Sequence, residues 1–196
     1  MKIRTLLFSI FLLGLASEIS AQQFAVDQNA IMISGTGSFM TQGGDIFVDS
    51  GGNEQRIFSL TSEVNYFIAR HLFIGGAIDF SRNSQGDYKS SGIGIGPRIG
   101  IAMGGLKDNV YPYISFGMKY YEMNANYGSG SDVRYSGSDM AFGVGVIVPL
   151  KPNIGLVFEG GYSILDLKNS DSGKKFQGNI LSVGIGIAGL IYDSLE

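Results

Sequence analysis

The sequence lacks several residue types that would point to well-known classes of protein. It contains no cysteine, no tryptophan and a single histidine, and only 16% of its 196 residues are charged. Without cysteine, a disulfide scaffold, a thiolate zinc site and a lipid-anchored cysteine are excluded. A net charge of −3 does not indicate the basic surface that nucleic-acid binding requires. Because 44% of the residues are hydrophobic, the chain is not of the disordered class either.

The first 21 residues have the features of a secretory signal peptide. Lys2 and Arg4 precede an apolar run from Leu6 to Leu15, and Ala21 is a small residue suited to cleavage. The run is shorter than the ~20 residues that a spanning helix needs, which disfavours a membrane anchor. We therefore predict an exported protein with a signal peptide at 1–21 and a single domain at 22–196.

Along the mature chain, large apolar residues alternate with small residues at a period of two. The clearest segment has aliphatic side chains on one face, namely Ile93, Ile95, Ile99 and Ile101. Its other face carries Gly94, Gly96, Arg98 and Gly100. Eight segments of this kind, each of roughly ten to fourteen residues, predict eight β-strands.

The composition of the two faces favours a membrane barrel. A soluble secreted sandwich, which is the rival fold, would expose Lys, Glu, Thr and Gln opposite its core, whereas this chain has glycine and alanine there. Glycine makes up about 15% of the chain, twice the ordinary usage. In a lipid-facing barrel the large residues point to acyl chains and the small ones fill the lumen. We predict an all-β fold: an eight-stranded antiparallel up-and-down transmembrane β-barrel.

Short and long connections alternate between these segments, as expected for periplasmic turns and extracellular loops. The short connections are 69–71, 104–109 and 149–153. The long connections are 42–55, 83–89, 124–136 and 168–175. Loops 42–55 and 124–136 are the longest, so we predict that they make any contact with an extracellular protein or surface ligand.

Aromatic residues near the segment ends predict two interfacial girdles, because amphipathic rings settle at the level of lipid headgroups. At the long-loop end these residues are Phe39, Phe58, Phe80, Tyr120 and Tyr162. At the opposite rim they are Tyr66 and Tyr111.

Five charged residues fall on the lumen-facing side of the alternation: Glu63, Asp79, Arg98, Lys119 and Glu159. The interior of an eight-stranded barrel is just wide enough for side chains to fill. Isolated buried charges are costly, so we expect these groups to pair in a plug centred on Arg98. The alternative is a ring of charges that selects ions in a small pore.

The segment from Phe58 to Gly76, with its outward alternation, very short turn and glycine-bearing return strand, resembles a hairpin of the outer-membrane β-barrel domain family. The whole mature chain is similar in architecture to its small eight-stranded, OmpA/OmpX-like members. This resemblance implies location in the outer membrane, contact with bilayer lipid and assembly by the outer-membrane machinery. It also implies a structural or surface-interaction role, such as envelope integrity, adhesion or host-factor binding. Such barrels commonly end on an aromatic residue, whereas here Tyr192 is followed by four more residues.

Catalytic and cofactor motifs are weak. His71 lies in a short connection on the presumed periplasmic side, whereas a lipid-modifying barrel enzyme, the alternative function, needs its catalytic groups near the outer leaflet. Gly184 to Gly189 spells a dinucleotide fingerprint, but it lies inside an alternating strand. One histidine without cysteine does not support an ordinary metal site. We predict a non-enzymatic protein without cofactor or metal.

Overall fold

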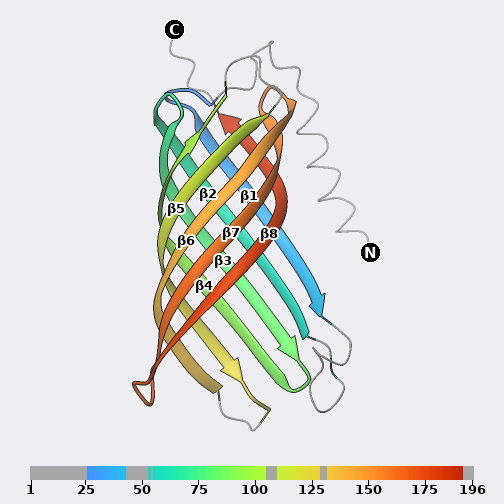
Figure 1. Ribbon diagram of the computed structural model, residues 1–196, viewed down its shortest axis with the longest axis vertical. Coiled ribbons are helices and arrows are strands. Elements are labelled where there is room, and N and C mark those ends of the chain that lie inside the picture. The colour runs from blue at the N-terminus through green and yellow to red at the C-terminus, as the bar shows by residue number, and fades with distance from the viewer. Residues whose placement is uncertain (1–25, 43–52, 54, 105–109, 129–131, 192–196) are drawn as a thin grey trace, which may run out of the picture.

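Eight antiparallel strands close into a barrel in the computed structural model of the chain (Figure 1). The strands are β1 (Ile31–Gln42), β2 (Gln55–Ala69), β3 (Leu72–Gln85), β4 (Tyr88–Ala102), β5 (Tyr111–Asn126), β6 (Asp132–Lys151), β7 (Ile154–Asn169) and β8 (Lys175–Ile191). Each strand pairs with its neighbour in sequence, and β1 also pairs with β8, from Ile31↔Ile191 to Gly37↔Ile185. The predicted fold class is confirmed.

The structure describes residues 26–42, 53, 55–104, 110–128 and 132–191. The predicted signal peptide at 1–21, most of loop 42–55 and the residues that follow Ile191 lie outside this part of the chain. Among the described residues, no helix is long and apolar enough to cross a membrane.

The alternation of the sequence corresponds to the two faces of the barrel wall. On β4, Ile93 and Ile95 are 53% and 58% exposed, while Arg98 is 8% exposed. The large aliphatic side chains therefore point outward and the small or charged ones point into the lumen. This is the distribution that a wall facing acyl chains requires.

Six of the eight strands, with 15 to 20 residues, are longer than the alternation predicts, while β1 and β3 have 12 and 14 residues. The predicted loop 83–89 is reduced to the two residues Gly86 and Asp87, because Gln85 still pairs with Tyr88. The predicted loop 124–136 is reduced to 127–131, between β5 and β6. Strand pairing needs only backbone groups, so the ladders continue into polar sequence beyond the apolar alternation.

The end of the lumen near the short turns is filled by apolar side chains. This apolar plug consists of Val26, Ala30, Met32, Phe67, Phe73, Ala102, Tyr111, Tyr113, Ile147, Val157, Ala188 and Leu190. Residues ahead of β1 contribute to it, because the Asn29 backbone N–H donates to the Phe67 carbonyl at 2.8 Å and the Phe67 N–H donates to the Ala30 carbonyl at 2.9 Å. The chain before β1 therefore helps to close this end of the barrel.

Lumen-facing glycines make room for aromatic rings. A Cβ atom at Gly100 would overlap the ring of Phe73, and one at Gly92 would overlap the ring of Tyr121. Phe73 and Tyr121 lie inside the barrel, 0% and 6% exposed. Glycine at these two positions is thus a condition for packing large rings into a narrow lumen.

Candidate functional site

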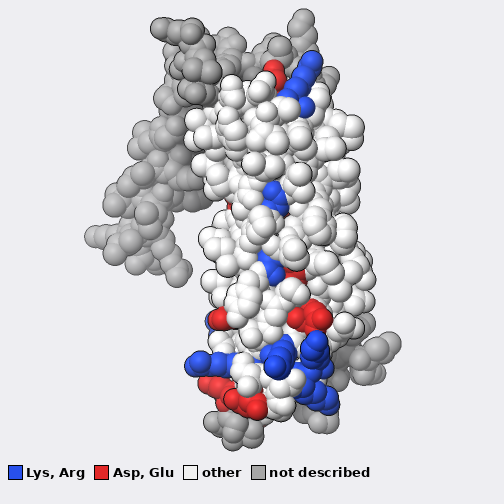
Figure 2. Space-filling model, turned by 90° about the vertical axis from the view of Figure 1, so that its left-hand side faces the viewer, with Lys and Arg blue, Asp and Glu red and all other residues white. Residues whose placement is uncertain are grey.

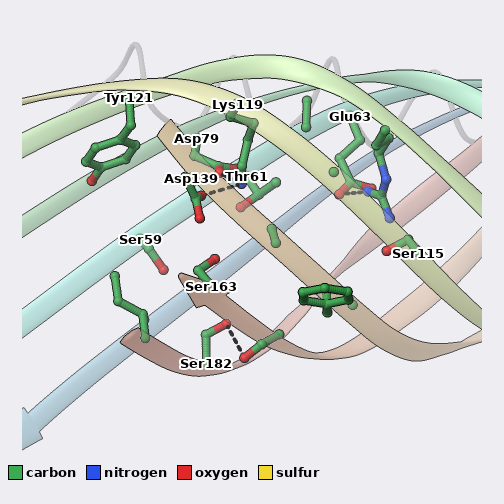
Figure 3. Close-up of a pocket in the computed structure, with 18 of the residues that line it drawn as sticks. Ser59, Thr61, Glu63, Asp79, Ser115, Lys119, Tyr121, Asp139, Ser163 and Ser182 are labelled. Atoms are coloured by element: carbon green, nitrogen blue, oxygen red, sulfur yellow. Dashed lines mark hydrogen bonds and ion pairs between the residues drawn. The ribbon is translucent and has the colours of Figure 1, made fainter. Parts of the chain in front are cut away.

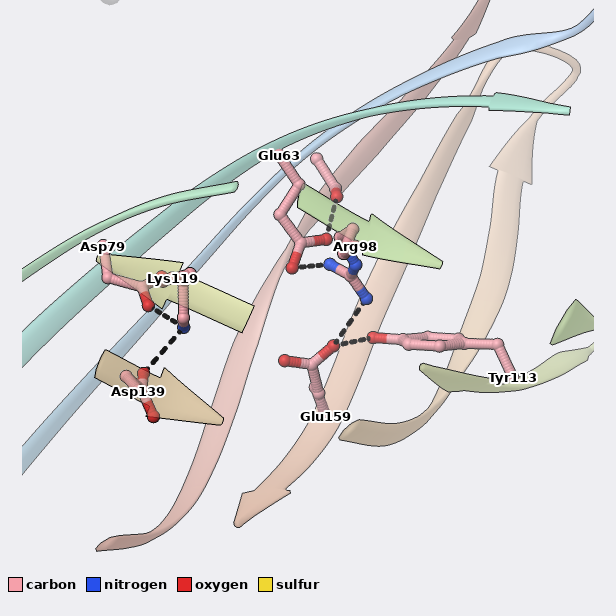
Figure 4. A network of polar contacts seen from close by, with 8 residues as sticks. Glu63, Asp79, Arg98, Tyr113, Lys119, Asp139 and Glu159 are labelled. Carbon is pink, nitrogen blue, oxygen red and sulfur yellow. Dashed lines mark hydrogen bonds and ion pairs between the residues drawn. The ribbon is translucent and has the colours of Figure 1, made fainter. Parts of the chain in front are cut away.

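Arg98, on β4, lies between two carboxylates deep in the lumen (Figure 4). It pairs with Glu63 on β2, and its Nη2 lies 3.9 Å from Oε2 of Glu159 on β7. The Ser34 hydroxyl donates to Glu63 at 2.9 Å, and the Tyr113 hydroxyl donates to Glu159 at 2.5 Å. We call these five residues the Arg98 cluster. Each of its carboxylates has a hydroxyl donor in addition to the guanidinium.

Lys119, on β5, forms a second cluster nearer the long-loop end. It pairs with Asp79 on β3, and its Nζ lies 3.2 Å from Oδ2 of Asp139 on β6 (Figure 4). We call these three residues the Lys119 cluster. Lys119 is 8% exposed and Asp139 is 4% exposed, so the ion pairs are shielded from bulk water.

All five charged residues predicted for the lumen are found there, but they form two clusters rather than one plug centred on Arg98. The sequence prediction missed Asp139. It began the sixth segment at Met140, although the alternation places Asp139 on the face opposite outward-pointing Met140. The pairing of Lys119 with Asp139 in the β5–β6 register provides the signal that would have identified this residue.

The two clusters together hold more acid than base. Four carboxylates, those of Glu63, Asp79, Asp139 and Glu159, face the two cations Arg98 and Lys119. If all six groups are ionised, the net charge of the clusters is −2. Buried charge of this kind is stable only when the remaining lone pairs find donors.

A polar cavity of about 140 Å³ lies in the lumen beside both clusters (Figure 3). Its wall includes hydroxyl side chains of Ser59, Ser163 and Ser182. The Oδ1 atoms of Asp79 and Asp139, which are also wall residues, are buried and have no hydrogen-bond partner among the described residues. A polar cavity of this size is large enough to admit water. Side chains of both clusters thus line this space, but these two carboxylate oxygen atoms are themselves buried away from it.

The predicted interfacial aromatics point outward, with one exception. Phe39, Phe58, Tyr66, Phe80, Tyr120 and Tyr162 are between 41% and 71% exposed. Tyr111 is 1% exposed and belongs to the apolar plug, so its prediction as an interfacial residue is wrong. On β5 the even-numbered residues, such as Ile114, point outward, and the odd-numbered Tyr111 therefore points inward.

An aromatic group at the long-loop end was not predicted. The rings of Tyr88 and Tyr127 lie 5.2 Å apart, and those of Tyr135 and Phe176 lie 5.5 Å apart. The hydroxyl groups of Tyr127 and Tyr135 are 3.3 Å apart. This hydrogen bond, together with partial burial, raises the pKa of Tyr127 to about 12. The two ring contacts join residues that are far apart in sequence, which a period-two pattern does not reveal.

His71 lies in the turn between β2 and β3, as predicted, at the short-turn end. Its φ of 73° is in the left-handed region, and its Nδ1 is 2.9 Å from the Ala102 carbonyl oxygen. It belongs to neither lumen cluster. Within the described residues, no group of three or more His, Asp or Glu side chains is arranged to hold a metal ion.

A model of the outer membrane protein beta-barrel domain family matches residues 10–188. The chain belongs to this family. It is therefore an outer-membrane protein, and its apolar wall is embedded in the bilayer. The predicted alternation of short and long connections holds only in part, because 103–110 at the short-turn end is longer than 86–87, 127–131 and 170–174 at the other end. We place the end that carries 43–54 outside the cell, since such barrels generally have their longest loops there.

Solved structures of outer-membrane barrels share this fold at low sequence identity. Neisserial surface protein A is 16% identical with a TM-score of 0.56, covering 82% of this chain and 96% of its own. OprG from Pseudomonas aeruginosa is 12% identical with a TM-score of 0.60, covering 89% and 100%. No curated protein sequence matches the chain significantly. At these identities, the likeness establishes the fold and not a specific activity.

Proposed function

We propose that this outer-membrane barrel is a non-enzymatic, non-conducting envelope protein, which acts through its outer wall and its extracellular end. The observation that carries the proposal is the filling of the lumen. Phe67, Phe73, Tyr111 and Ile147 in the apolar plug are each no more than 1% exposed. Two ion-pair clusters follow on the extracellular side of the plug. A continuous water path along the axis would have to displace both layers.

The two alternatives gain no support from a particular observation. A small ion-selective pore would need an open path past the apolar plug. A lipid-modifying enzyme would need a base beside a nucleophile near the outer leaflet. His71 instead lies at the periplasmic end and is engaged with the Ala102 carbonyl. Lipid A mass spectra recorded with and without the protein would reveal any such modification.

Conductance across a planar bilayer tests the closed lumen. The mature protein, inserted at known amount and judged folded by its gel shift on heating, is expected to add no steady current to a lipid-only bilayer. An open 16-stranded porin, prepared in the same detergent, provides the positive control. Steady single-channel steps from the wild-type protein would overturn the proposal of a non-conducting barrel.

The extracellular connections are the proposed site of contact with partners. We propose that 42–55 and the connection between β5 and β6 contact an extracellular protein or surface ligand, in adhesion or host-factor binding. Removing 44–52 or 127–131 should leave the gel shift on heating intact and abolish the binding of bacteria to host cells or serum proteins. Binding that survives both deletions would contradict the assignment to these loops.

We also propose that insertion depends on the outer-membrane assembly machinery. Depleting its central barrel component should leave the protein without its heat-dependent gel shift. Unchanged insertion after depletion would contradict this partner.

A further inference from the structure

The polar cavity in the lumen is hollowed into the wall formed by β5 to β8. One row of this wall consists of Ser115, Gly143, Gly161 and Ser182, each paired with the next. All four residues line the cavity. A Cβ atom at Gly143 would overlap the Ser115 hydroxyl and would lie 3.6 Å from Cδ of Glu159. The absence of a side chain at Gly143 therefore leaves a space that has a hydroxyl and a carboxylate at its edge.

Glu159 has one carboxylate oxygen that a ligand in this cavity can use. Its side chain lines the cavity and is 18% exposed. Arg98 and the Tyr113 hydroxyl both approach Oε2 of this carboxylate. Figure 4 shows the other oxygen, Oε1, on the side away from Tyr113. Oε1 can therefore accept a hydrogen bond from a donor in the cavity.

Hydroxyl groups around the cavity provide further acceptors. Thr61, Ser115 and Ser163 line it, and no hydrogen bond joins their hydroxyl groups to another described residue. Figure 3 shows these side chains on different strands around one space. A hydroxyl oxygen accepts hydrogen bonds as well as donating one. A ligand rich in donors is thus suited to this wall.

The charge of the two clusters favours a cation in the cavity. Four carboxylates face two cations, so the clusters carry a net charge of −2 when all six groups are ionised. Inside a barrel of low dielectric constant this excess repels an anion and attracts an ammonium group. An ammonium group has three donors and no acceptor, which matches a carboxylate oxygen beside hydroxyl oxygens.

The cavity is open on the side of β1. Pairing between β1 and β8 ends at Gly37↔Ile185, although β8 begins at Lys175. None of the described residues of β1 lines the cavity. Ile180 on β8 lines it and is 50% exposed, whereas Leu165, a lining residue on β7, is 8% exposed. The gap between β1 and β8 therefore gives the cavity an opening with an apolar edge.

We propose that the cavity binds a small primary alkylammonium compound. The ammonium group donates to Glu159 and Ser115, and the alkyl chain passes Ser163 toward Ile180 and the opening. The cavity of about 140 Å³ is comparable to an engineered cavity of about 150 Å³ that holds one benzene molecule. This site goes beyond the proposed function, because binding inside the lumen needs neither conduction nor a surface partner.

Titration with n-butylammonium chloride tests the site, with the mature protein in neutral-lipid nanodiscs and backbone amide NMR signals as the readout. The signals of Gly143 and Gly161 should shift and reach saturation. 1-Butanol and sodium butyrate have the same chain length but a neutral or an anionic head group. Both should bind at least about 10-fold more weakly, because hydrogen bonds between charged groups are the stronger ones. On the face shown in Figure 2, few charged residues lie between the two ends of the barrel, so competing sites on this part of the wall are few.

Three variants test whether binding occurs in the cavity. Ser163→Leu fills the space, so the saturable shifts should disappear. Ser62→Leu makes the same change at an exposed position of β2 that does not line the cavity, and it should leave binding unchanged. Glu159→Gln should weaken binding about 10-fold. The gel shift on heating reports folding. If Ser163→Leu loses this shift, Ser115→Ala removes one acceptor without adding volume and should weaken binding.

Four results overturn the proposal. The absence of saturable shifts in the wild type would show that there is no site. Equal affinity for 1-butanol or butyrate would show that positive charge is not recognised. Unchanged binding in folded Ser163→Leu and Glu159→Gln would place the ligand outside the cavity. Sodium chloride that produces the same shifts at the same concentration would show a site for inorganic cations. Each result leaves the conductance test of the proposed function unaffected.

Discussion

The Arg98 cluster and the Lys119 cluster have the same charge composition but different surroundings. Each places one cation between two carboxylates. In the Arg98 cluster, Ser34 and Tyr113 donate to the carboxylates, and the guanidinium lies 5.5 Å from the centre of the Phe73 ring in the apolar plug. In the Lys119 cluster, both aspartates keep one buried oxygen atom without a donor in the part of the chain that the structure describes.

This difference separates two ways of holding charge inside a narrow barrel. The Arg98 cluster satisfies its charges with protein groups, so its stability depends on every member being present. The Lys119 cluster leaves two buried carboxylate oxygen atoms without a donor among the described residues, so it has fewer contacts to lose. We infer that the first cluster tolerates substitution poorly and that the second tolerates it better.

Replacing Arg98 should have the largest effect. Arg98→Met keeps much of the side-chain volume but leaves Glu63 and Glu159 as uncompensated buried charges. Breaking a buried ion pair in this way typically costs about 3–5 kcal/mol. The temperature at which the folded band disappears in detergent gels should therefore fall clearly below that of the wild type.

Arg134→Met is the matched control, because it removes the same side chain from the exposed rim. Its melting temperature should stay close to that of the wild type. An unchanged melting temperature for Arg98→Met would contradict the role of the Arg98 cluster as a structural plug.

Replacing Lys119 should have a smaller effect. Lys119→Met leaves Asp79 and Asp139 facing each other across the lumen, but it disturbs fewer contacts than Arg98→Met, because no described hydroxyl group donates to either aspartate. We expect a loss of about 1–3 kcal/mol, the range for a buried polar group that loses its partner. Urea unfolding in the same lipid vesicles compares the two variants directly. A loss equal to that of Arg98→Met would remove the distinction between the clusters.

The sequence predicts the barrel well because a wall between lipid and lumen imposes a strict period of two. Ile93, Ile95 and Arg98 could be assigned to their faces without a structure. Pairing across the lumen follows no such local rule. Glu63 and Glu159 come from β2 and β7, and their shared partner Arg98 is fixed only by barrel closure and tilt.

Errors occurred where the alternation was not carried far enough. Asp139 and Tyr111 lie at the ends of apolar segments. Asp139 is one residue from outward-pointing Met140, and Tyr111 is three residues from outward-pointing Ile114. The alternation therefore places both side chains inside the barrel. The extracellular rim shows the same effect, since Arg82 and Lys89 were assigned to a loop or its edge but belong to paired strands. Both residues pair across β3 and β4 although the sequence there has no apolar pattern.

The smallest expected effect is the difference in stability loss between two variants, each of which neutralises one carboxylate in a different cluster. Asp139→Asn removes a charge whose Oδ1 lacks a donor, while Asp79 still pairs with Lys119, so stability should change by less than about 1 kcal/mol. Glu159→Gln gives up the charged acceptor of the Tyr113 hydroxyl and should lose about 1.5 kcal/mol. Both variants preserve shape, and urea midpoints in lipid vesicles resolve the difference. If Asp139→Asn lost as much as Glu159→Gln, the number of hydrogen-bond donors at each carboxylate would not decide its contribution, and the two clusters would hold charge in the same way.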